Sequence, residues 1–380
     1  MNIVADDRIP LAKEAFAALG KIRLLPGREI GQSDLENCDC LIVRTVTRVD
    51  EDLLKNSPVK FVGTATIGMD HIDQAYLKKE KIGFSNAAGC NAEAASEYVI
   101  SGLFAIAQKK SINLFNKKIG IVGYGNVGKR LADKLRALGI NYVINDPPRQ
   151  QAGLLDEHSV DLDTLIESVD VISLHVPLTR SGQHSTFHLF DAKNLAKLRP
   201  NTIFINAARG EIVNNAALEA LLTTREDLSV FLDTWENEPL ISESLLQMVT
   251  LGTPHIAGYS VEGRLRGTQM MLDAVAAHFD LQPDWNMENN LPKNQIIQSD
   301  LSEQNEFYWH SMFKLHFDIW RDHKALQAYS QQPKESRARY FDSLRRNYPD
   351  RIEYDNTDIF GISQKKAASI ARQLLFNLND

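Results

Sequence analysis

The stretch from Gly120 to Gly128 constrains the fold of this chain more than any other part of the sequence. It reads GIVGYGNVG, and Gly123, Gly125 and Gly128 match the pattern GxGxxG. In that pattern the first glycine permits a tight turn, the second lets backbone approach a pyrophosphate, and the third lets a helix pack on the preceding strand. Amides at the helix N-terminus then face the phosphates. The pattern predicts a dinucleotide-binding site.

The segments on either side support this interpretation. A strand candidate at Lys118–Val122 comes first, and a helix candidate at Val127–Leu138 follows and ends at Gly139, a residue typical of helix C-caps. The next strand candidate ends at Asp146, whose carboxylate can accept hydrogen bonds from the adenosine ribose and would repel the extra phosphate of NADP. We therefore expect NAD as the cofactor, although the neighbouring Arg149 weakens that preference.

The same alternation of short apolar strands and amphipathic helices continues along most of the chain, and it indicates parallel sheets. Further strands are expected at Asn2–Asp6, Cys40–Arg44, Lys60–Thr64, Tyr142–Asn145, Val169–Leu174, Thr202–Asn206 and Ser229–Leu232, and further helices at Leu11–Leu19, Glu93–Lys109 and Gly263–Phe279. The predicted class is α/β, with two doubly wound Rossmann-like domains. After residue 285 the chain is rich in aromatic and charged residues and favours helices with few strands, which predicts a separate C-terminal α+β domain.

Composition excludes several classes of protein. The 380 residues carry a formal net charge of -7, which argues against a nucleic-acid or membrane-surface binder, since those partners select for basic faces. The first residues lack the basic and apolar regions of a signal peptide, and no apolar run is long enough to span a membrane, so neither feature is expected. Three cysteines without a CxxC pair are typical of a reducing compartment, so we expect a cytoplasmic protein. No histidine pair has the spacing of a zinc site, and no metal is expected.

Three polar segments each follow a strand candidate in the second half of the chain. They are Asn206–Gly210, Asp233–Pro239 and Gly252–Tyr259. Ligands of an open parallel sheet bind beyond the carboxyl ends of its strands, so all three segments can face one site.

Four residues of these segments suit the oxidation of a hydroxy acid. When an alcohol loses a hydride its hydroxyl proton must also leave, and the neutral imidazole of His255 can accept it. Glu238 can hold that ring and favour the imidazolium that forms. Arg209 is permanently charged and suits the substrate carboxylate, while Asp233 can approach the nicotinamide ribose or ring amide. Each residue alone has an ordinary structural interpretation, but together, after a nucleotide pattern, they predict a dehydrogenase.

These motifs resemble those of the D-isomer specific 2-hydroxyacid dehydrogenase family. The resemblance covers the GxGxxG run, TATIGMDHID at 64–73, HVPLT at 175–179, NAARG at 206–210 and TPHIA at 253–257. It implies an NAD-dependent oxidoreductase with Arg209, Glu238 and His255 as the catalytic residues. The cofactor-binding residues it implies are Gly123, Gly125, Asn126, Val127, Gly128, Asp146, His175, Asn206, Ala207, Ala208, Asp233 and Gly258.

The resemblance also implies a division into three domains. Residues 1–95 with 257–284 would form a split substrate-binding domain, and residues 96–256 the NAD-binding Rossmann domain. Residues 285–380 would form a C-terminal dimerisation domain, so that the protein is a homodimer and a chain cut near residue 285 yields monomers or aggregates.

Within the family, the likeness is greatest to enzymes of vitamin B6 (pyridoxine) biosynthesis that oxidise 4-phospho-D-erythronate to 3-hydroxy-2-oxo-4-phosphobutanoate. It rests on residues 43–47, 61–66 and 255–259 and on the C-terminal extension. Thr45, Thr66 and Tyr259 would then contact the substrate. A phosphorylated acid needs a second anion site besides Arg209, and the candidates for it are Arg44, Arg48, Arg264 and Arg266.

Two alternatives stay open at this point. The chain can be another member of the family, acting on phosphoglycerate, glyoxylate or a similar acid. It can also be an NAD(H)-sensing binding protein on the same fold, as are some transcriptional corepressors. The complete set of Arg209, Glu238 and His255 favours an enzyme.

Overall fold

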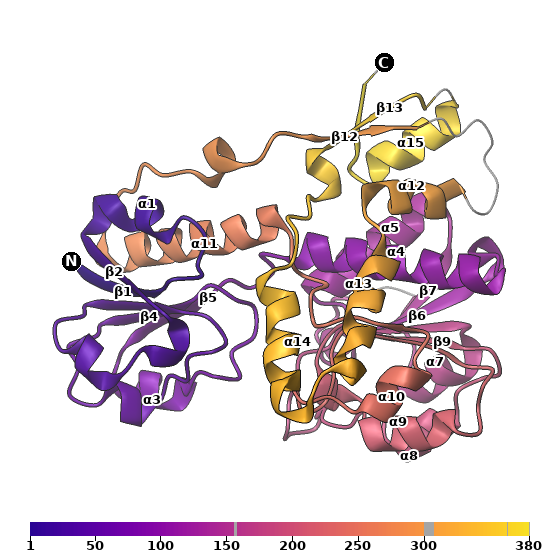
Figure 1. Cartoon of the computed structure of the whole chain (residues 1–380), viewed down its shortest axis with the longest axis horizontal. Coiled ribbons are helices and arrows are strands. Elements are labelled where there is room, and N and C mark those ends of the chain that lie inside the picture. The colour runs from indigo at the N-terminus through magenta and orange to yellow at the C-terminus, as the bar shows by residue number, and fades with distance from the viewer. Residues whose placement is uncertain (156–157, 300–307, 363, 380) are drawn as a thin grey trace. The chain divides into compact units, whose positions relative to one another are not determined.

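The computed structural model of the chain describes residues 1–155, 158–299, 308–362 and 364–379. Their contacts group them into two compact units, coloured by residue number in Figure 1. Unit 1 comprises Met1–Ala92 and Ser260–Lys293, and unit 2 comprises Glu93–Tyr259 and Asn294–Asp380. The chain therefore leaves unit 1 after Ala92, returns to it at Ser260, and leaves it a second time after Lys293 to end in unit 2. The residue ranges expected for three domains stay a prediction.

Unit 1 contains a five-stranded, all-parallel sheet in the order β2-β1-β3-β4-β5. Its strands are β1 (Asn2–Asp6), β2 (Lys21–Leu25), β3 (Cys40–Val43), β4 (Phe61–Thr64) and β5 (Gly83–Asn86). Its helices are α1 (Ala12–Phe16), α2 (Glu51–Leu54), α3 (Gln74–Lys79) and α11 (Val261–Phe279). Separate apolar clusters cover the two faces of this sheet, as expected where helices pack on both sides.

Unit 2 contains a six-stranded, all-parallel sheet in the order β11-β10-β9-β8-β6-β7. Its strands are β6 (Lys118–Val122), β7 (Asn141–Asn145), β8 (Val171–Leu174), β9 (Ile203–Asn206), β10 (Ser229–Leu232) and β11 (Leu251–Gly252). The helices before residue 260 are α4 (Ala92–Lys110), α5 (Asn126–Leu138), α6 (Pro147–Gln151), α7 (Leu162–Ser168), α8 (Ala192–Ala196), α9 (Asn215–Leu222) and α10 (Glu243–Met248). The predicted α/β class with two doubly wound parallel sheets is confirmed.

Individual elements follow from their sequences. Helix α5 ends where Gly139 adopts φ 72°, a left-handed conformation that glycine takes without steric cost, and so the predicted C-cap is confirmed. Helix α4 was expected to be buried on several faces, and Val99, Leu103 and Ile106 are all in the core. Helix α1 is shorter than expected because the chain tightens into a 3-10 turn at Ala17–Leu19.

The described residues after Asn294 form a small third sheet and four α-helices. Strands β12 (Gln295–Gln298), β13 (Thr357–Phe360) and β14 (Asn377–Leu378) are all parallel, in that order. The helices are α12 (Tyr308–His316), α13 (Ile319–Gln327), α14 (Arg337–Arg346) and α15 (Lys365–Gln373). Figure 1 shows β12, β13, α12 and α15 grouped together, with α13 and α14 running side by side.

This C-terminal segment shares the cores of unit 2. Trp309 and Phe313 of α12 belong to the apolar cluster built around α4. Leu326, Tyr329 and Phe341 belong to the cluster on the other face of the sheet. The segment is therefore part of the packing of unit 2 within a single chain.

Two negative findings hold for the described ranges. No helix there is long and apolar enough to cross a membrane. No three histidine, cysteine, aspartate or glutamate side chains in the described part gather closely enough to hold a metal ion. Cys38, Cys40 and Cys90 are buried and form no disulfide among the described residues, and burial raises the pKa of Cys38 to about 11.

Candidate active site

The glycine-rich turn of unit 2 lies where the order of the sheet reverses. From β6 the chain first adds β7 on one side and then crosses to β8 on the other, and ligands bind at such a switch point. Gly123 there has φ 94°, and a Cβ on it would lie 2.7 Å from the backbone of His175, which follows β8. A Cβ on Gly128 would lie 2.0 Å from the carbonyl oxygen of Gly123. Both positions therefore require glycine, as the pattern predicts.

The middle glycine has the opposite environment. A Cβ on Gly125 would meet no atom of the described residues within 4 Å, so the space in front of it is open. Gly125 is the N-cap of α5 and has no side chain to cap the amides of the first turn, which include Asn126 and Val127. Helix N-terminal amides beside open space suit a pyrophosphate. The residues of this turn therefore fit a dinucleotide.

Asp146 follows β7 and is tied to the glycine turn. Its Oδ2 accepts a hydrogen bond from the backbone N–H of Tyr124 at 2.8 Å, and its Oδ1 caps α6 by accepting from Arg149 N–H at 3.1 Å. Each carboxylate oxygen can accept a further bond, so Asp146 can still bind ribose hydroxyls. The predicted residue thus also shapes the turn that would hold the phosphates.

His175 lies directly after β8. Its backbone N–H donates to the carbonyl of Val122 at 2.7 Å, and its Nε2 lies 2.8 Å from the hydroxyl oxygen of Ser173. Burial lowers the pKa of His175 to about 3, so its ring is neutral at physiological pH. A neutral imidazole fits a contact with the cofactor better than a role as a cation.

The turn after β9 is held by its own asparagine. Asn206 donates from Nδ2 to the carbonyl of Arg209 at 2.8 Å and accepts at Oδ1 from Ala208 N–H at 3.1 Å. A Cβ on Gly210 would lie 2.0 Å from the carbonyl oxygen of Trp235, so this turn packs closely on the turn after β10. The arrangement places Arg209, with Ala207 and Ala208, at the carboxyl edge of the sheet.

Asp233 organises the loop that carries the predicted base. Its Oδ1 accepts from the Thr253 hydroxyl at 2.6 Å and from Ile256 N–H at 2.9 Å, and its Oδ2 accepts from Ala257 N–H at 2.9 Å. The side chain is buried. Asp233 therefore has a structural role in this loop. Its contact with the nicotinamide ribose or ring amide stays a prediction, and so does the cofactor contact of Gly258.

Glu238 and His255 form a hydrogen-bonded pair. His255 Nδ1 lies 2.8 Å from Glu238 Oε2, and Glu238 Oε1 accepts from Trp235 N–H at 2.8 Å. His255 has φ 58°, an unfavourable conformation for a non-glycine residue that is typical of functional sites. Because the carboxylate engages Nδ1, the other ring nitrogen is left to exchange a proton with a substrate.

The charge state of the pair follows from its surroundings. Burial, the largest single influence, raises the pKa of the Glu238 carboxyl. The His255 charge, their hydrogen bond and the charge of Arg345 outweigh it and hold that pKa below its ordinary value. Glu238 is thus a carboxylate that can orient the imidazole and stabilise the imidazolium.

Arg345 was not among the residues predicted from the sequence. It comes from α14, and its guanidinium carbon lies 5.7 Å from the ring centre of Tyr259. Tyr259, a predicted substrate residue, also packs edge-on against Tyr348, with ring centres 6.3 Å apart. No local motif surrounds Arg345, so only the packing of α14 on unit 2 identifies it.

The other predicted substrate and phosphate residues belong to unit 1. Thr66 hydrogen-bonds Thr64 at 2.8 Å between hydroxyl oxygens, and Thr45 is exposed in the turn after β3. Among the four candidate arginines, Arg44 pairs with buried Asp6 at 3.2 Å, and Arg48 pairs with Asp50 at 2.7 Å. Arg264 and Arg266 donate to the backbone carbonyls of Ser260 and Cys90.

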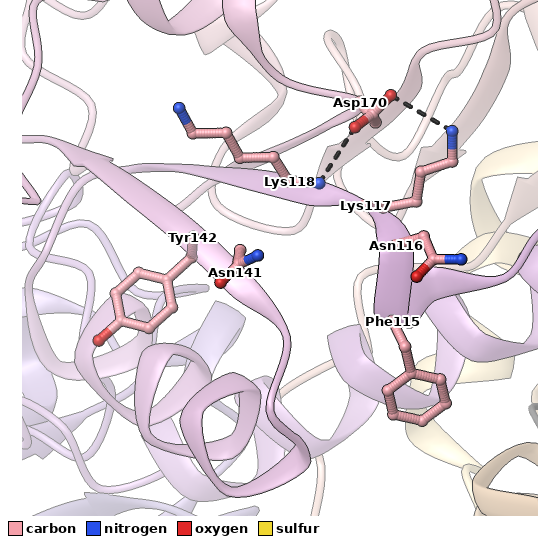
Figure 2. Close-up of a pocket in the computed structure, with 7 residues that line it drawn as sticks. All are labelled: Phe115, Asn116, Lys117, Lys118, Asn141, Tyr142 and Asp170. Carbon is pink, nitrogen blue, oxygen red and sulfur yellow. Dashed lines mark hydrogen bonds and ion pairs between the residues drawn. The ribbon is translucent and has the colours of Figure 1, made fainter.

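A separate hollow lies at the amino ends of β6 and β7, the edge of the sheet opposite to the predicted site. It has a volume of about 540 Å³ and is lined by Phe115, Asn116, Lys117, Lys118, Asn141, Tyr142 and Asp170. In Figure 2 the Asp170 carboxylate binds the backbone N–H of Lys118 and the ammonium of Lys117. The Asp170 carboxylate thus already pairs with Lys117. The residues that line this hollow do not include Arg209, Glu238 or His255.

Comparison with known proteins agrees with this geometry. Residues 87–257 match the family model described as "D-isomer specific 2-hydroxyacid dehydrogenase, NAD binding domain". The chain is 41% identical over 379 residues to an erythronate-4-phosphate dehydrogenase of Salmonella arizonae, with 99% of this chain and 98% of the relative covered. It is 41% identical over 381 residues to the enzyme of the same name from Escherichia fergusonii, with the same coverage.

Solved structures share the fold. The NAD⁺-bound 3-phosphoglycerate dehydrogenase of Entamoeba histolytica superposes with a TM-score of 0.64 at 24% identity, covering 74% of this chain and 95% of that one. The D-lactate dehydrogenase of Aquifex aeolicus, in complex with NAD and lactic acid, superposes with a TM-score of 0.60 at 22% identity, covering 74% and 96%.

Proposed function

The chain belongs to the D-isomer specific 2-hydroxyacid dehydrogenase family, and on that premise we propose that it oxidises 4-phospho-D-erythronate with NAD. The product is 3-hydroxy-2-oxo-4-phosphobutanoate, an intermediate of vitamin B6 synthesis. The substrate rests on 41% identity, over nearly the whole length of both chains, to enzymes named for it. The observation that carries the chemistry is the hydrogen bond between Glu238 and His255 at the carboxyl edge of an NAD-binding sheet.

Each catalytic residue has a defined task in this reaction. Glu238 Oε2 holds His255 at Nδ1, so that Nε2 accepts the proton of the C2 hydroxyl. Arg209 binds the substrate carboxylate through its planar guanidinium. When bound, NAD supplies the acceptor for the hydride of the C2 carbon. The alcohol thus loses one hydride and one proton, and the proton leaves on His255 as the ketone forms.

The test is a spectrophotometric assay of NADH production. We expect kcat/KM for 4-phospho-D-erythronate to exceed that for D-erythronate and glycolate by at least about 100-fold, since these acids leave the phosphate site empty. It should also exceed that for 3-phospho-D-glycerate, whose chain is one carbon shorter and cannot place the carboxylate and the phosphate at the same separation. A His255→Gln enzyme serves as the control for contaminating activity. A higher kcat/KM for one of the other acids would reassign the substrate within the family. Tight NADH binding without turnover of any acid would instead indicate a sensor.

A homodimer formed through the C-terminal segment is part of this proposal. Large apolar side chains are exposed there: Ile296 on the edge strand β12 is 69% exposed, and Leu315 of α12 is 50% exposed. Exposed apolar side chains on an edge strand suit burial by a second copy. Cutting the chain near residue 285 is a blunt test, because Phe313 and Tyr354 belong to the core of unit 2.

Point substitutions test the dimer more sharply. We expect Ile296→Asp and Leu315→Lys to shift the protein toward monomers in sedimentation velocity, while each chain keeps its fold. Leu24→Lys, at an exposed apolar position on β2 of unit 1, is the matched control and should leave the assembly unchanged. Dimers of unaltered stability in both C-terminal variants would contradict this interface.

The buried thiols Cys38, Cys40 and Cys90 support a cytoplasmic location, because reduced cysteines are typical of that compartment. Fractionation of cells that express the tagged protein would check it.

A further inference from the structure

Helix α13 and the turn that follows it contact the loops that hold the catalytic pair. The Tyr329 hydroxyl donates to the carbonyl of Pro239, the residue after Glu238, at 3.5 Å. The Nδ1 atom of His323 accepts a hydrogen bond from the backbone N–H of Gly252 at 3.0 Å, three residues before the predicted base. The C-terminal segment therefore supports both sides of the predicted active site within one chain.

Arg351 makes a third contact, beyond α14. Its guanidinium donates to the carbonyl of Ala257 and lies 4.7 Å from the ring centre of Tyr98 on α4 and 5.1 Å from that of Phe317. Cation–π packing of this kind holds a buried guanidinium in one place. Arg351 thus connects the end of the 253–257 loop, which carries His255, to the C-terminal segment.

Arg345 differs from these supports because its charge acts on the Glu238 carboxylate. Its side chain hydrogen-bonds Tyr259, over whose ring its guanidinium lies. Its Nε atom is shielded from solvent and has no hydrogen-bond partner among the residues that the structure describes. A buried donor without a partner is costly, and where it occurs in a native fold it points to a functional role.

The charges of His255 and Arg345 both act on the carboxylate of Glu238. Tyr259 and Glu238 raise the pKa of Arg345 despite its burial, and Arg345 contributes to the low pKa of Glu238. On the elements packed against the His255–Glu238 pair, the further charged or titratable side chains include Arg209, Asp233, Glu236, Tyr259, Tyr329, Asp342 and Tyr348. Asp233 is committed to the backbone of the 253–257 loop, and Glu236 is paired with His188 at 2.6 Å.

We propose that Arg345 is a positioning residue of the active site, which shares the Glu238 carboxylate with His255 and fixes Tyr259 beside them. The inference builds on the proposed dehydrogenase function. Two cations beside one carboxylate also repel each other, so that each makes the charge of the other less favourable. We therefore expect the His255 imidazolium to form more readily once the charge of Arg345 is removed. The C-terminal segment thereby sets the pH range of the reaction as well as completing the fold.

Four variants separate charge from structure. Arg345→Met removes the charge and the hydrogen bond, Arg345→Gln removes the charge but keeps a donor for Tyr259, and Arg345→Lys keeps the charge. Arg346→Met is the matched control, since Arg346 is the next residue of α14 and is exposed. Thermal unfolding of each full-length variant verifies its fold before any comparison.

The primary readout needs no substrate. NMR titration of the His255 ring, assigned by its loss in His255→Gln, gives the pH midpoint of its protonation in each variant. We expect the midpoint to rise by about one pH unit in Arg345→Met and Arg345→Gln, since loss of a nearby cation shifts a titration by about that amount. Arg345→Lys and Arg346→Met should stay close to the wild type. An unchanged midpoint in Arg345→Gln, or an equal rise in Arg346→Met, would overturn the proposal.

The pH profile of kcat/KM gives the second readout. Its acid limb should move to higher pH by the same amount in Arg345→Gln, and KM should rise further in Arg345→Met because Tyr259 loses its partner. If 4-phospho-D-erythronate is not turned over by the wild type, the proposed substrate fails, while the NMR titration still decides the role of Arg345. If Arg345→Met does not fold, the Gln and Lys variants still give a decision, because they differ from each other in charge.

Discussion

The two parallel sheets of this protein share one architecture but use their switch points in opposite ways. In unit 2 the point between β6 and β8 carries the glycine turn, with open space in front of Gly125. In unit 1 the corresponding point lies between β1 and β3, where Asp6 at the end of β1 pairs with Arg44 after β3 at 3.2 Å. A Cβ on Gly27 would lie only 2.2 Å from the Asp6 carboxylate, so this point is filled by protein.

The comparison shows that the sheet topology provides a place for a ligand, whereas the first residues after each strand decide whether it is used. Unit 2 keeps backbone amides and one imidazole nitrogen available at its carboxyl edge. Unit 1 uses its charged side chains at the same edge for an internal ion pair. The family relationship agrees with this division, because the matched NAD-binding model covers residues 87–257.

The largest expected effect comes from removing the base of unit 2. His255→Gln should lower kcat by about 1,000-fold, within the range of general-base catalysis, because Gln cannot take the hydroxyl proton. NAD affinity, measured by calorimetry, should stay unchanged, since the glycine turn is intact. A kcat within tenfold of the wild type would show that the carboxyl edge of unit 2 does not hold the base.

The second effect tests the filled switch point of unit 1. Arg44→Met should destabilise the protein by about 3 kcal/mol, because removing one partner leaves the buried Asp6 carboxylate unpaired. The double variant Arg44→Met with Asp6→Asn should regain most of that stability in urea unfolding.

Substrate kinetics sharpen this second test. If Arg44→Met keeps its stability but loses the preference for 4-phospho-D-erythronate over D-erythronate, then Arg44 binds the substrate phosphate. The two switch points would in that case be alike in serving ligands.

Acid should affect the two units differently. Burial, followed by the charge of Arg351, lowers the pKa of His316 in unit 2 to about 3, whereas His71 and His278 of unit 1 are not buried. A histidine whose folded pKa is depressed contributes stability that is fully present above its unfolded pKa, near 6.5, and is lost as pH falls toward the folded pKa. The loss from pH 7 to pH 5 should be about 2 kcal/mol.

Urea unfolding followed by tryptophan fluorescence at both pH values measures this loss. His316→Phe should reduce the difference between the two pH values by about that amount, since a phenyl ring suits contacts with Tyr354 and Phe376 and does not titrate. His278→Gln, at an exposed position of unit 1, should keep the full pH dependence. An unaltered dependence in His316→Phe would contradict the assignment.

The smallest effect concerns the acidic residue beside the glycine turn. Asp146→Ala should reduce the preference for NAD over NADP by about tenfold, because one charge-assisted hydrogen bond to the ribose and the repulsion of a phosphate are both lost. The ratio of kcat/KM for the two cofactors gives the result, with the exposed Asp133→Ala as the control on α5. Equal ratios in wild type and variant would remove Asp146 from cofactor selection.

Local patterns predicted much of unit 2. Strands β6 and β10 begin and end at the predicted residues, and β7, β8 and β9 differ only at their first residues. These strands are short apolar runs bounded by turns, so their limits are encoded by neighbours in sequence. The roles of Arg209, Glu238 and His255 are predictions from their spacing and family motifs, and the structure adds the hydrogen bond between the last two.

Other features had no local signal. The Asp6–Arg44 ion pair joins the ends of two different strands. The sequence shows no link between these residues, and so it could not indicate that Asp6 already pairs with Arg44, a candidate for the phosphate site. Arg345 lies in an ordinary charged helix, and its contact with Tyr259 depends on how α14 packs on unit 2. Interactions of this kind join residues far apart in the chain, as does the 2.9 Å hydrogen bond from Tyr98 to Asp322.

The sequence by itself determined the dinucleotide turn, the two parallel sheets and the residue types that perform the chemistry. These features depend on residues that are close together in the sequence, through local sterics and hydrogen bonding. They are a turn that requires glycine, a strand of four apolar residues and an acidic residue after the next strand. Only the tertiary structure decided which charges meet, that the C-terminal segment packs within unit 2, and that Arg345 reaches Tyr259. The physical reason is that ion pairs and packing depend on distances in space. For residues far apart in the chain, these distances are fixed only when the core has formed.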